Sequence, residues 1–244
     1  MASPRYITFD CYGTLVNFDL TPATLRVLGA RTKRIDLNRF FDDFEAIRFQ
    51  QVLGPYRPYR EVLCRSLEEV MTRFELEYRS ADGDEIVHAV PTFGPFPDVP
   101  DALARLRGRF KLVIISNTDD DLIVHNVRNI GVPFDHVITA EQARAYKPSH
   151  RIFHHALDVL GCGPEDILHV AQGFEYDIVP AHELGWSRVW INRYGQPGDQ
   201  AYGPYIELPD LSSLPPLLGI SRWPASTSDS WIGWREAREI GRES

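Results

Sequence analysis

The stretch Tyr6-Ile7-Thr8-Phe9-Asp10-Cys11-Tyr12-Gly13-Thr14-Leu15 decides how the rest of the chain can fold. Its first four residues are β-branched or aromatic, which is typical of a short buried strand. Asp10 follows this run directly. Ligands of open α/β sheets bind outside the carboxyl ends of the strands, so a carboxylate at this position would be accessible to a substrate. The alternative is that Asp10 only begins a turn, because Asp-x-x-Gly is common in turns.

Length and composition limit the classes to which the protein can belong. The chain has 244 residues, of which 43% are hydrophobic and 25% are charged, which suits one large α/β domain or a core with a smaller insertion. No apolar run approaches the roughly 20 residues of a membrane span, and the first residues lack the apolar stretch of a signal peptide. We therefore expect a cytoplasmic protein. The formal net charge of −8 argues against nucleic acid as a partner, because phosphate binding depends on Lys and Arg.

The cysteines do not indicate a metal site or a disulfide framework. Cys11, Cys64 and Cys162 are widely spaced and form no Cys-x-x-Cys pair. We expect all three to be reduced thiols. Cys11 lies beside Asp10, but a small packing residue is the preferred explanation over a nucleophile.

Residues 16–90 have few strand-like runs and are expected to form an inserted helical module. Apolar side chains recur at helical spacing in two stripes, one over residues 37–47 and one over residues 62–74. A loop at residues 54–58 separates the stripes. Arg48 and Arg57 lie on or next to these apolar faces, where a cation must be paired, reach solvent or bind an anion. For each arginine alone, a surface position is the simpler explanation.

The remainder of the chain alternates strands and helices after a linker at residues 91–97 that is rich in Pro and Gly. We expect strands at residues 111–115, 134–138, 167–171 and 187–192. Helices are expected at 99–106, 122–130 and 152–160, and after a turn at 172–177 as far as Gly185. This alternation predicts βαβ units and a mainly parallel sheet.

The expected domains are therefore an α/β core of residues 1–15 and 91–220, a helical cap of residues 16–90, and a tail of residues 221–244. The tail is polar except for Trp223, Trp231, Ile232 and Trp234. It is either a flexible end or a segment that docks its Trp side chains on the core or on a second subunit.

Polar residues follow four of the expected strands. These residues are Asp10, Ser116 with Asn117, Lys147 and Asp177. A parallel sheet brings its strand ends to one edge, so these side chains can converge although they are far apart in the sequence. A plain salt bridge is the alternative explanation for Lys147 and Asp177.

With this ordered set, the chain resembles the haloacid dehalogenase superfamily of hydrolases over nearly all of residues 5–215. The resemblance implies a Rossmann-like parallel sheet flanked by helices, with residues 16–90 as the cap domain. It also implies that Asp10 is the nucleophile, that Ser116 is the Ser/Thr after the second strand, and that Lys147 in Tyr-Lys-Pro and Asp177 complete the site.

Two positions separate this chain from the phosphatases of the superfamily. Phosphatases carry Asp-x-Asp, whose second Asp protonates the leaving alkoxide, and they use Mg²⁺. Here Tyr12 takes the place of that acid, and Ala171-Gln172 replaces the usual Gly-Asp. A hard divalent cation needs several oxygen ligands including carboxylates, so we expect neither a metal nor another cofactor.

The motif Asp-x-Tyr-Gly-Thr-Leu, together with Ser116-Asn117 and the segment Trp190-Ile191-Asn192-Arg193, is similar to the L-2-haloacid dehalogenase branch. That branch implies that Asp10 attacks C2 of a short 2-haloalkanoic acid and that water hydrolyses the resulting aspartyl ester. Lys147 would keep Asp10 ionised, and Asp177 would help to activate the water. The implied contacts to the substrate carboxylate are Ser116 and the backbone amides around Thr14 or Thr118, and the implied contacts to the halide are Asn117 and a cap arginine, with Arg48 preferred to Arg57. Cys11 and Tyr12 are further expected substrate contacts.

The expected partner is thus a small anionic haloacid, and the branch also implies a possible homodimer. The chain departs from the best-marked dehalogenases at Ala171-Gln172-Gly173, where they carry Ser-Ser-Asn. Two other functions remain open on the sequence. One is a phosphatase of the same fold with an unusual site, and the other is a fold relative that has lost catalysis and serves as a binding protein.

Overall fold

The strand that begins at Tyr6 lies in the middle of a six-stranded sheet. The computed structural model describes residues 4–220, so the tail of residues 221–244, expected to be either a flexible end or a docking segment, lies outside the described part. The strand order is β3-β2-β1-β4-β5-β6, and all neighbours pair in parallel. The strands are β1 (Tyr6–Phe9), β2 (Lys111–Ser116), β3 (His136–Thr139), β4 (Ile167–Ala171), β5 (Ser187–Ile191) and β6 (Ile206–Leu208). The predicted parallel sheet is confirmed.

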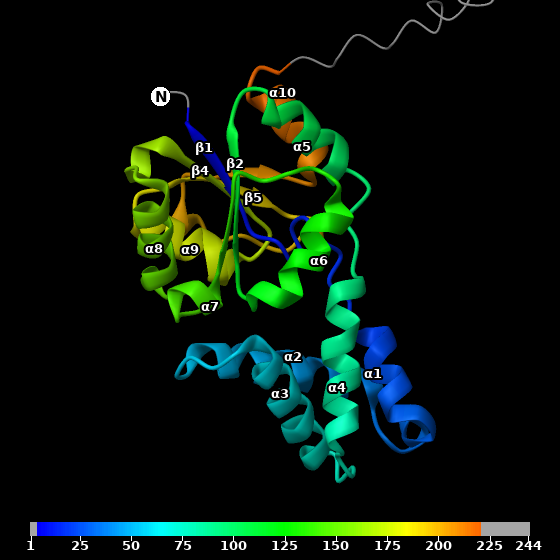
Figure 1. Cartoon of the computed structure of the whole chain (residues 1–244). Coiled ribbons are helices and arrows are strands. Elements are labelled where there is room, and N and C mark those ends of the chain that lie inside the picture. The colour runs from blue at the N-terminus through cyan, green and yellow to red at the C-terminus, as the bar shows by residue number, and fades with distance from the viewer. Residues whose placement is uncertain (1–3, 221–244) are drawn as a thin grey trace, which may run out of the picture.

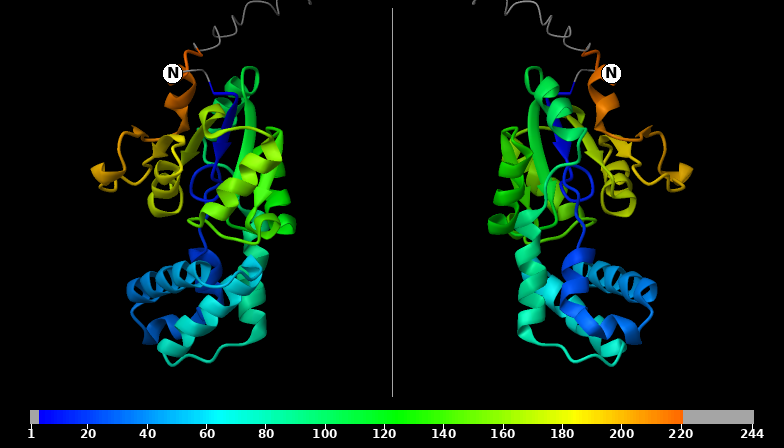
Figure 2. Two further views of the ribbon diagram at one scale, coloured as in Figure 1. Left: turned by 90° about the vertical axis from the view of Figure 1, so that its left-hand side faces the viewer. Right: turned by 90° about the vertical axis from the view of Figure 1, so that its right-hand side faces the viewer.

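Helices cover both faces of the sheet because side chains of each strand alternate between the faces. On β1, Tyr6 packs in a cluster with α8 and α9, whereas Ile7 and Phe9 pack with α5, α6 and α10. The views in Figures 1 and 2 show this layered core. The core helices are α5 (Val99–Arg107), α6 (Asp120–Ile130), α7 (Ala140–Ala143), α8 (His150–Leu160), α9 (Val179–Glu183) and α10 (Leu214–Leu217).

The structure corrects three local expectations. The third strand begins at His136 rather than Phe134, because the Asp135 carboxylate accepts a hydrogen bond from the backbone of Leu112 (2.9 Å) before the strand starts. β6 was not predicted, since it has only three residues. The helix expected after the turn at 172–177 is shorter: a wide π-helical turn (Phe174–Ile178) precedes α9.

The insertion forms a helical layer at the carboxyl edge of the sheet (Figure 1). It contains α1 (Thr21–Leu28), α2 (Leu37–Leu53), α3 (Tyr59–Arg73) and α4 (Ser80–Ala89). The two predicted stripes are the buried faces of α2 and α3, which pack against each other. Nowhere in residues 4–220 does a helix have both the length and the apolar composition needed to cross a membrane.

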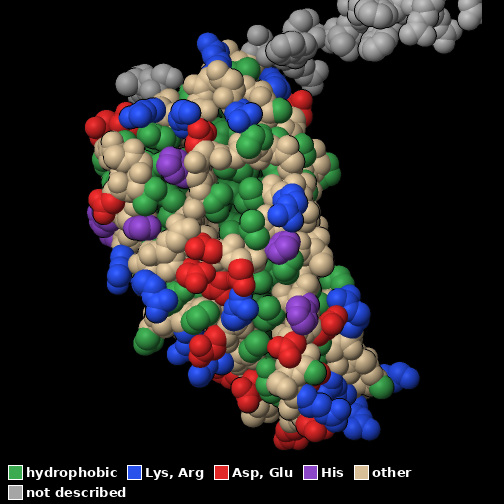
Figure 3. Space-filling model, viewed as in Figure 1, with side chains coloured by type: hydrophobic (Ala, Val, Ile, Leu, Met, Phe, Trp, Pro, Cys, Tyr) green, Lys and Arg blue, Asp and Glu red, His purple; other side chains and the backbone are tan. Residues whose placement is uncertain are grey.

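Polar contacts fasten the helical cap to the core. The buried Asp119 carboxylate, just before α6, accepts hydrogen bonds from the backbone N–H groups of Tyr59 (2.7 Å) and Arg60 (3.1 Å). It thereby caps α3, whose own N-cap residue, Pro58, makes no side-chain capping bond. Acidic side chains gather where cap and core meet in Figure 3. These contacts hold the start of α3 over the strand ends.

Candidate active site

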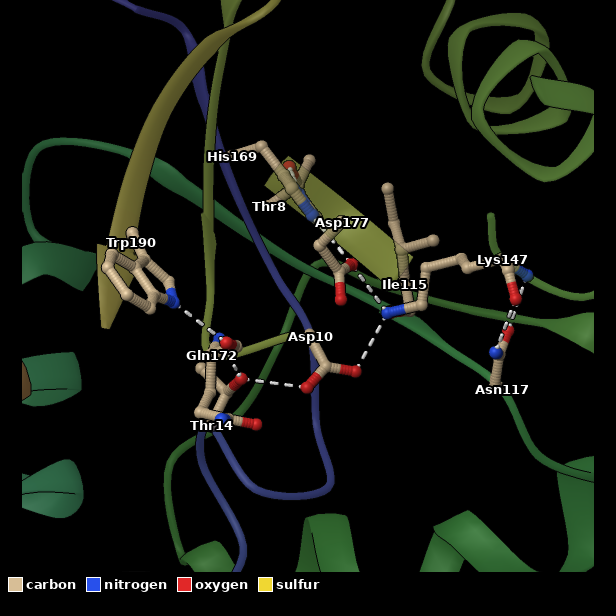
Figure 4. Close-up of polar contacts among 10 residues, drawn as sticks. All are labelled: Thr8, Asp10, Thr14, Ile115, Asn117, Lys147, His169, Gln172, Asp177 and Trp190. Carbon is tan, nitrogen blue, oxygen red and sulfur yellow. Dashed lines mark hydrogen bonds and ion pairs between the residues drawn. The ribbon is translucent and has the colours of Figure 1, made fainter. Parts of the chain in front are cut away.

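Lys147 joins two carboxylates at the carboxyl edge of the sheet. Its Nζ donates to Asp10 Oδ1 (2.7 Å), to Asp177 Oδ1 (2.7 Å) and to the backbone oxygen of Ile115 (2.9 Å), as Figure 4 shows. Three acceptors satisfy all three N–H donors of an ammonium group. The Lys147 side chain is buried, as are both carboxylates. The strand ends thus bring together three side chains that the sequence places far apart.

The turn after β1 orients the Asp10 carboxylate. The Asp10 backbone N–H donates to Val170 (3.1 Å), which fastens the end of β1 to β4. Gly13 has a φ of +89°, a conformation that L side chains rarely adopt, and so the chain can turn back here. Thr14 Oγ1 then donates to Asp10 Oδ2 (2.7 Å) and accepts from the backbone N–H of Gln172 (2.8 Å). Each oxygen of Asp10 therefore has one donor.

The same contacts determine the charges of the site. Burial raises the pKa of Asp10, and the Lys147 ammonium and the Thr14 hydroxyl offset only part of that rise. Burial also acts to raise the pKa of Asp177, but Lys147 and His169 outweigh it, so that the pKa of Asp177 is lowered. Burial acts to lower the pKa of Lys147, but its two carboxylate partners raise it. As the pH falls, Asp10 therefore gains a proton before Asp177 does, while Lys147 stays charged.

Two side chains at the end of β2 belong to the site: Ser116 supplies a hydroxyl, and Asn117 binds the backbone of Lys147. Ser116 Oγ is buried, borders the cavity described below, and has no hydrogen-bond partner within residues 4–220. Asn117 holds the peptide of Lys147 from both sides: its Oδ1 accepts from the Lys147 N–H (2.7 Å) and its Nδ2 donates to the Lys147 carbonyl (2.9 Å). The Asn117 side chain thus positions the Lys147 loop, and one N–H of its amide group remains for a ligand.

A cavity of about 420 Å³ lies between the cap and these strand ends. The cap lines it with Glu45, Arg48, Val52 and Tyr59, and the core lines it with Asp10, Lys147, Asp177, Ser116, Asn117, Tyr12, Tyr176 and Tyr194 among others. The volume is in the range of pockets that bind small molecules. The catalytic set predicted from the sequence therefore borders one cavity.

The two candidate arginines of the cap differ clearly in position. Arg48 lines the cavity, and its guanidinium carbon lies 5.6 Å from the ring centroid of Phe18. Within residues 4–220 no carboxylate is close enough to form an ion pair with Arg48. Arg57 does not line the cavity, and its guanidinium lies 3.9 Å from Glu61. This geometry favours Arg48 as the cap cation that meets an anion.

Four further residues were predicted to contact the substrate, and the structure places them differently. Tyr12 lines the cavity, but its hydroxyl donates to Asn126 Oδ1 (2.9 Å) and burial raises its pKa, so the phenol does not replace the missing acid. The side chains of Cys11, Thr14 and Thr118 are buried and are not part of the cavity lining. Cys11 belongs to the apolar core, as expected for a packing residue.

The carboxylates of the site do not suit a divalent cation. Asp10 and Asp177 each direct one oxygen at the Lys147 ammonium, and Asp177 uses that same oxygen for His169. No group of three His, Cys, Asp or Glu side chains in the described chain has an arrangement that could hold a metal ion. The ammonium thus takes one oxygen of each carboxylate, and the proposed mechanism uses no metal.

Comparison with known proteins identifies the family. The family model described as haloacid dehalogenase-like hydrolase matches residues 4–185. The chain belongs to this family.

The hydrolase has two curated relatives that align over most of both chains. It is 28% identical to haloacetate dehalogenase H-2 of Moraxella sp. (strain B), over 88% of this chain and 97% of the relative. It is 26% identical to (S)-2-haloacid dehalogenase 4A of Burkholderia cepacia, over 88% of this chain and 95% of the relative. These relatives support the L-2-haloacid dehalogenase branch that the sequence motifs indicated.

A solved structure of L-2-haloacid dehalogenase from Xanthobacter autotrophicus, with chloropropionic acid covalently bound, shares the fold of the hydrolase. The TM-score is 0.76, the sequence identity is 23%, and the match covers 88% of this chain and 98% of that chain.

Sequence reasoning missed several residues that support the site of this hydrolase. His169 on β4 contacts Asp177, and Trp190 Nε1 donates to the carbonyl of Gln172 (2.9 Å). The sequence did carry a signal for His169, which stands inside the apolar run Ile167-Leu168-His169-Val170-Ala171. A buried imidazole needs polar partners, so a histidine in such a run indicates a buried polar contact. No comparable signal marked the Gln172 backbone, since its contacts depend on the packing of the loop after β4.

Proposed function

We propose that this hydrolase converts short 2-haloalkanoic acids into 2-hydroxy acids and halide through an aspartyl-ester intermediate, without a metal. The observation that carries the proposal is the oriented Asp10 carboxylate, held by Lys147 and Thr14 at the floor of a small cavity that also holds Arg48. The names of the curated relatives, and the covalently bound chloropropionic acid in the Xanthobacter enzyme, support the same reaction.

The first step is a displacement at carbon. A lone pair of an Asp10 oxygen attacks C2 of the substrate, a C–O bond forms, and the C–halogen bond breaks with its electron pair leaving on the halide. Halide is a stable anion and needs no proton from a general acid. The site suits this step, because the Tyr12 hydroxyl is bound to Asn126 and does not serve as an acid toward a leaving group.

The second step is hydrolysis of the ester. A water oxygen attacks the carbonyl carbon of the Asp10 ester while one water proton passes to the Asp177 carboxylate. The bond between that carbon and the ester oxygen attached to C2 then breaks, the departing alkoxide takes a proton to become the 2-hydroxy acid, and the Asp10 carboxylate is restored with the water oxygen in it. Overall, one water is consumed and one proton is released to solvent. Asp177 is suited to accept the proton because it stays ionised beside Lys147.

The two negative groups of the substrate require separate donors. Ser116 has a buried hydroxyl with no partner within residues 4–220, and it is assigned to the substrate carboxylate. Arg48 and the remaining N–H of Asn117 are assigned to the departing halide, whose charge develops in the transition state.

The proposal is tested by halide release from the two enantiomers of 2-chloropropanoate and from fluoroacetate, measured in EDTA and again with added Mg²⁺. We expect release from the (S)-enantiomer that is equal in both buffers, because no step uses a cation. The ratio of the chloride release rate to the fluoride release rate shows which halide the pocket accommodates better. Phosphate release from phosphate esters with Mg²⁺, in the absence of halide release, would instead identify a phosphatase.

Arg48→Gln is expected to lower kcat for halide release by roughly 10²- to 10³-fold, with a smaller change in KM, because the lost donor acts mainly on the charge that develops on the halide. Arg57→Gln is the matched control on the same cap and is expected to stay within about threefold of wild type. Steady-state kinetics with (S)-2-chloropropanoate measures both. A larger loss in Arg57→Gln than in Arg48→Gln would reverse the assignment of the cap arginine.

A further inference from the structure

A buried hydrogen-bonded chain runs behind the reacting groups, and its last two members are not used in the mechanism above. His169 Nε2 lies 2.9 Å from Asp177 Oδ1, and His169 Nδ1 lies 2.8 Å from Thr8 Oγ1. Both side chains are fully buried. The parallel pairing of β1 with β4 places Thr8 opposite His169, so two rigid strands hold the contact (Figure 4).

The surroundings of His169 determine which nitrogen carries a proton. The ionised Asp177 can only accept, so His169 Nε2 must carry the hydrogen between them. The Thr8 hydroxyl makes no other hydrogen bond within residues 4–220, and donation to His169 Nδ1 satisfies it. The imidazole also packs against the rings of Phe153 and Trp186, at centroid distances of 5.8 and 5.9 Å. A neutral imidazole with its proton on Nε2 satisfies every one of these groups.

The contact with His169 decides how the Asp177 carboxylate is turned. Lys147 and His169 both donate to Oδ1. In the described chain Oδ2 has no donor, and it faces Gly173, where an added Cβ would lie only 2.8 Å away. Asp177 also lines the cavity. Two donors on one oxygen leave the other oxygen free to accept, and Gly173, which lies beside that oxygen, also lines the cavity.

We propose that His169, oriented by Thr8, is a positioning residue for the second step: it holds Asp177 so that Oδ2 accepts the proton of the hydrolytic water. This inference rests on the proposed function. It assigns His169 no part in the displacement at C2, because that step needs Asp10 and the halide donors but no base. Loss of the imidazole should therefore slow ester hydrolysis selectively.

The test is rapid-quench kinetics on full-length His169→Phe, His169→Gln and Thr8→Val with excess (S)-2-chloropropanoate. We expect His169→Phe to release the first halide within about threefold of the wild-type rate and to hydrolyse the ester roughly 10- to 100-fold more slowly, as for the loss of one hydrogen bond to a charged group. Intact-mass measurement should show the alkylated enzyme accumulating. His169→Gln keeps an N–H donor and should recover part of the hydrolysis rate.

Thr8→Val and a control variant, His150→Gln, complete the design. Thr8→Val keeps the imidazole but removes the hydroxyl that fixes which ring nitrogen carries the proton. It should therefore also slow ester hydrolysis. It tests the role of His169 even if His169→Phe does not fold. His150→Gln removes a half-exposed histidine that pairs with Glu183 and should leave both steps unchanged.

The possible failures are distinguishable. Equal slowing of halide release and ester hydrolysis in His169→Phe and Thr8→Val, or no change in either step, would overturn the role of His169 while the proposed function stands. A wild-type enzyme that releases no halide would overturn both.

Discussion

Asp10→Asn is expected to abolish halide release, with kcat lower by a factor on the order of 10⁴ to 10⁶, as for the removal of a covalent nucleophile. An amide nitrogen has no lone pair available for attack at C2, and an amide oxygen is far less nucleophilic than a carboxylate. The fold should persist, because the amide keeps an oxygen for Lys147 and the Thr14 hydroxyl can turn to accept from the amide N–H. Halide release and thermal unfolding measure the two effects.

Asp135→Asn is the matched control, since it removes a carboxylate that lies far from the cavity lining. A single turnover in ¹⁸O-labelled water adds a direct readout of the wild-type mechanism. Attack of water on the ester carbonyl puts the label into the Asp10 carboxylate, whereas direct attack of water on C2 puts it into the product. Label found only in the product, or an Asp10→Asn variant with normal activity, would exclude Asp10 as the nucleophile.

Lys147→Met is expected to reduce the free energy of unfolding by about 3–5 kcal/mol at neutral pH, because it leaves two buried carboxylates without their cation. Lys111→Met is the matched control. Lys111 forms a 2.8 Å ion pair with Asp135, but its side chain is 62% exposed, and an exposed pair contributes at most about 1 kcal/mol. Denaturant unfolding of both variants gives the comparison.

The pH dependence of this deficit has a definite sign. Without Lys147, burial and mutual repulsion raise the pKa of both buried carboxylates above the unfolded values, so the folded state binds more protons than the unfolded state. Its stability then rises as the pH falls through those raised pKa values. We therefore expect the deficit of Lys147→Met relative to wild type to shrink between pH 7.5 and pH 5. A deficit that is constant over this range would show that the lost contacts are not electrostatic.

The same variant should change the acid limb of the activity profile. Asp10 must be ionised to attack, so activity falls as the pH drops through its pKa. Burial already places the wild-type limb above the ordinary pKa of an aspartate. Removal of the ammonium raises that pKa further, so the residual activity of Lys147→Met should disappear at a higher pH than wild-type activity. The pH profile of kcat/KM measures the shift.

The sequence by itself determined the fold class and the main members of the site. The apolar run Tyr6–Phe9 and its later counterparts alternate with amphipathic helices, and that pattern predicts parallel strands joined by crossover helices. Parallel strands end at one edge, which is why Asp10, Lys147 and Asp177 could be placed together from their positions alone. The insertion was likewise visible, because two apolar stripes of period 3.6 interrupt the strand pattern.

Only the tertiary structure decided how these side chains are oriented. The register of β1 against β4 sets Thr8 opposite His169, and no local pattern specifies that register. The packing of α2 over the strand ends turns Arg48 into the cavity and leaves Arg57 beside Glu61. Local sequence encodes which element a residue joins, whereas the direction of a buried hydrogen bond depends on which distant backbone lies within about 3 Å of it.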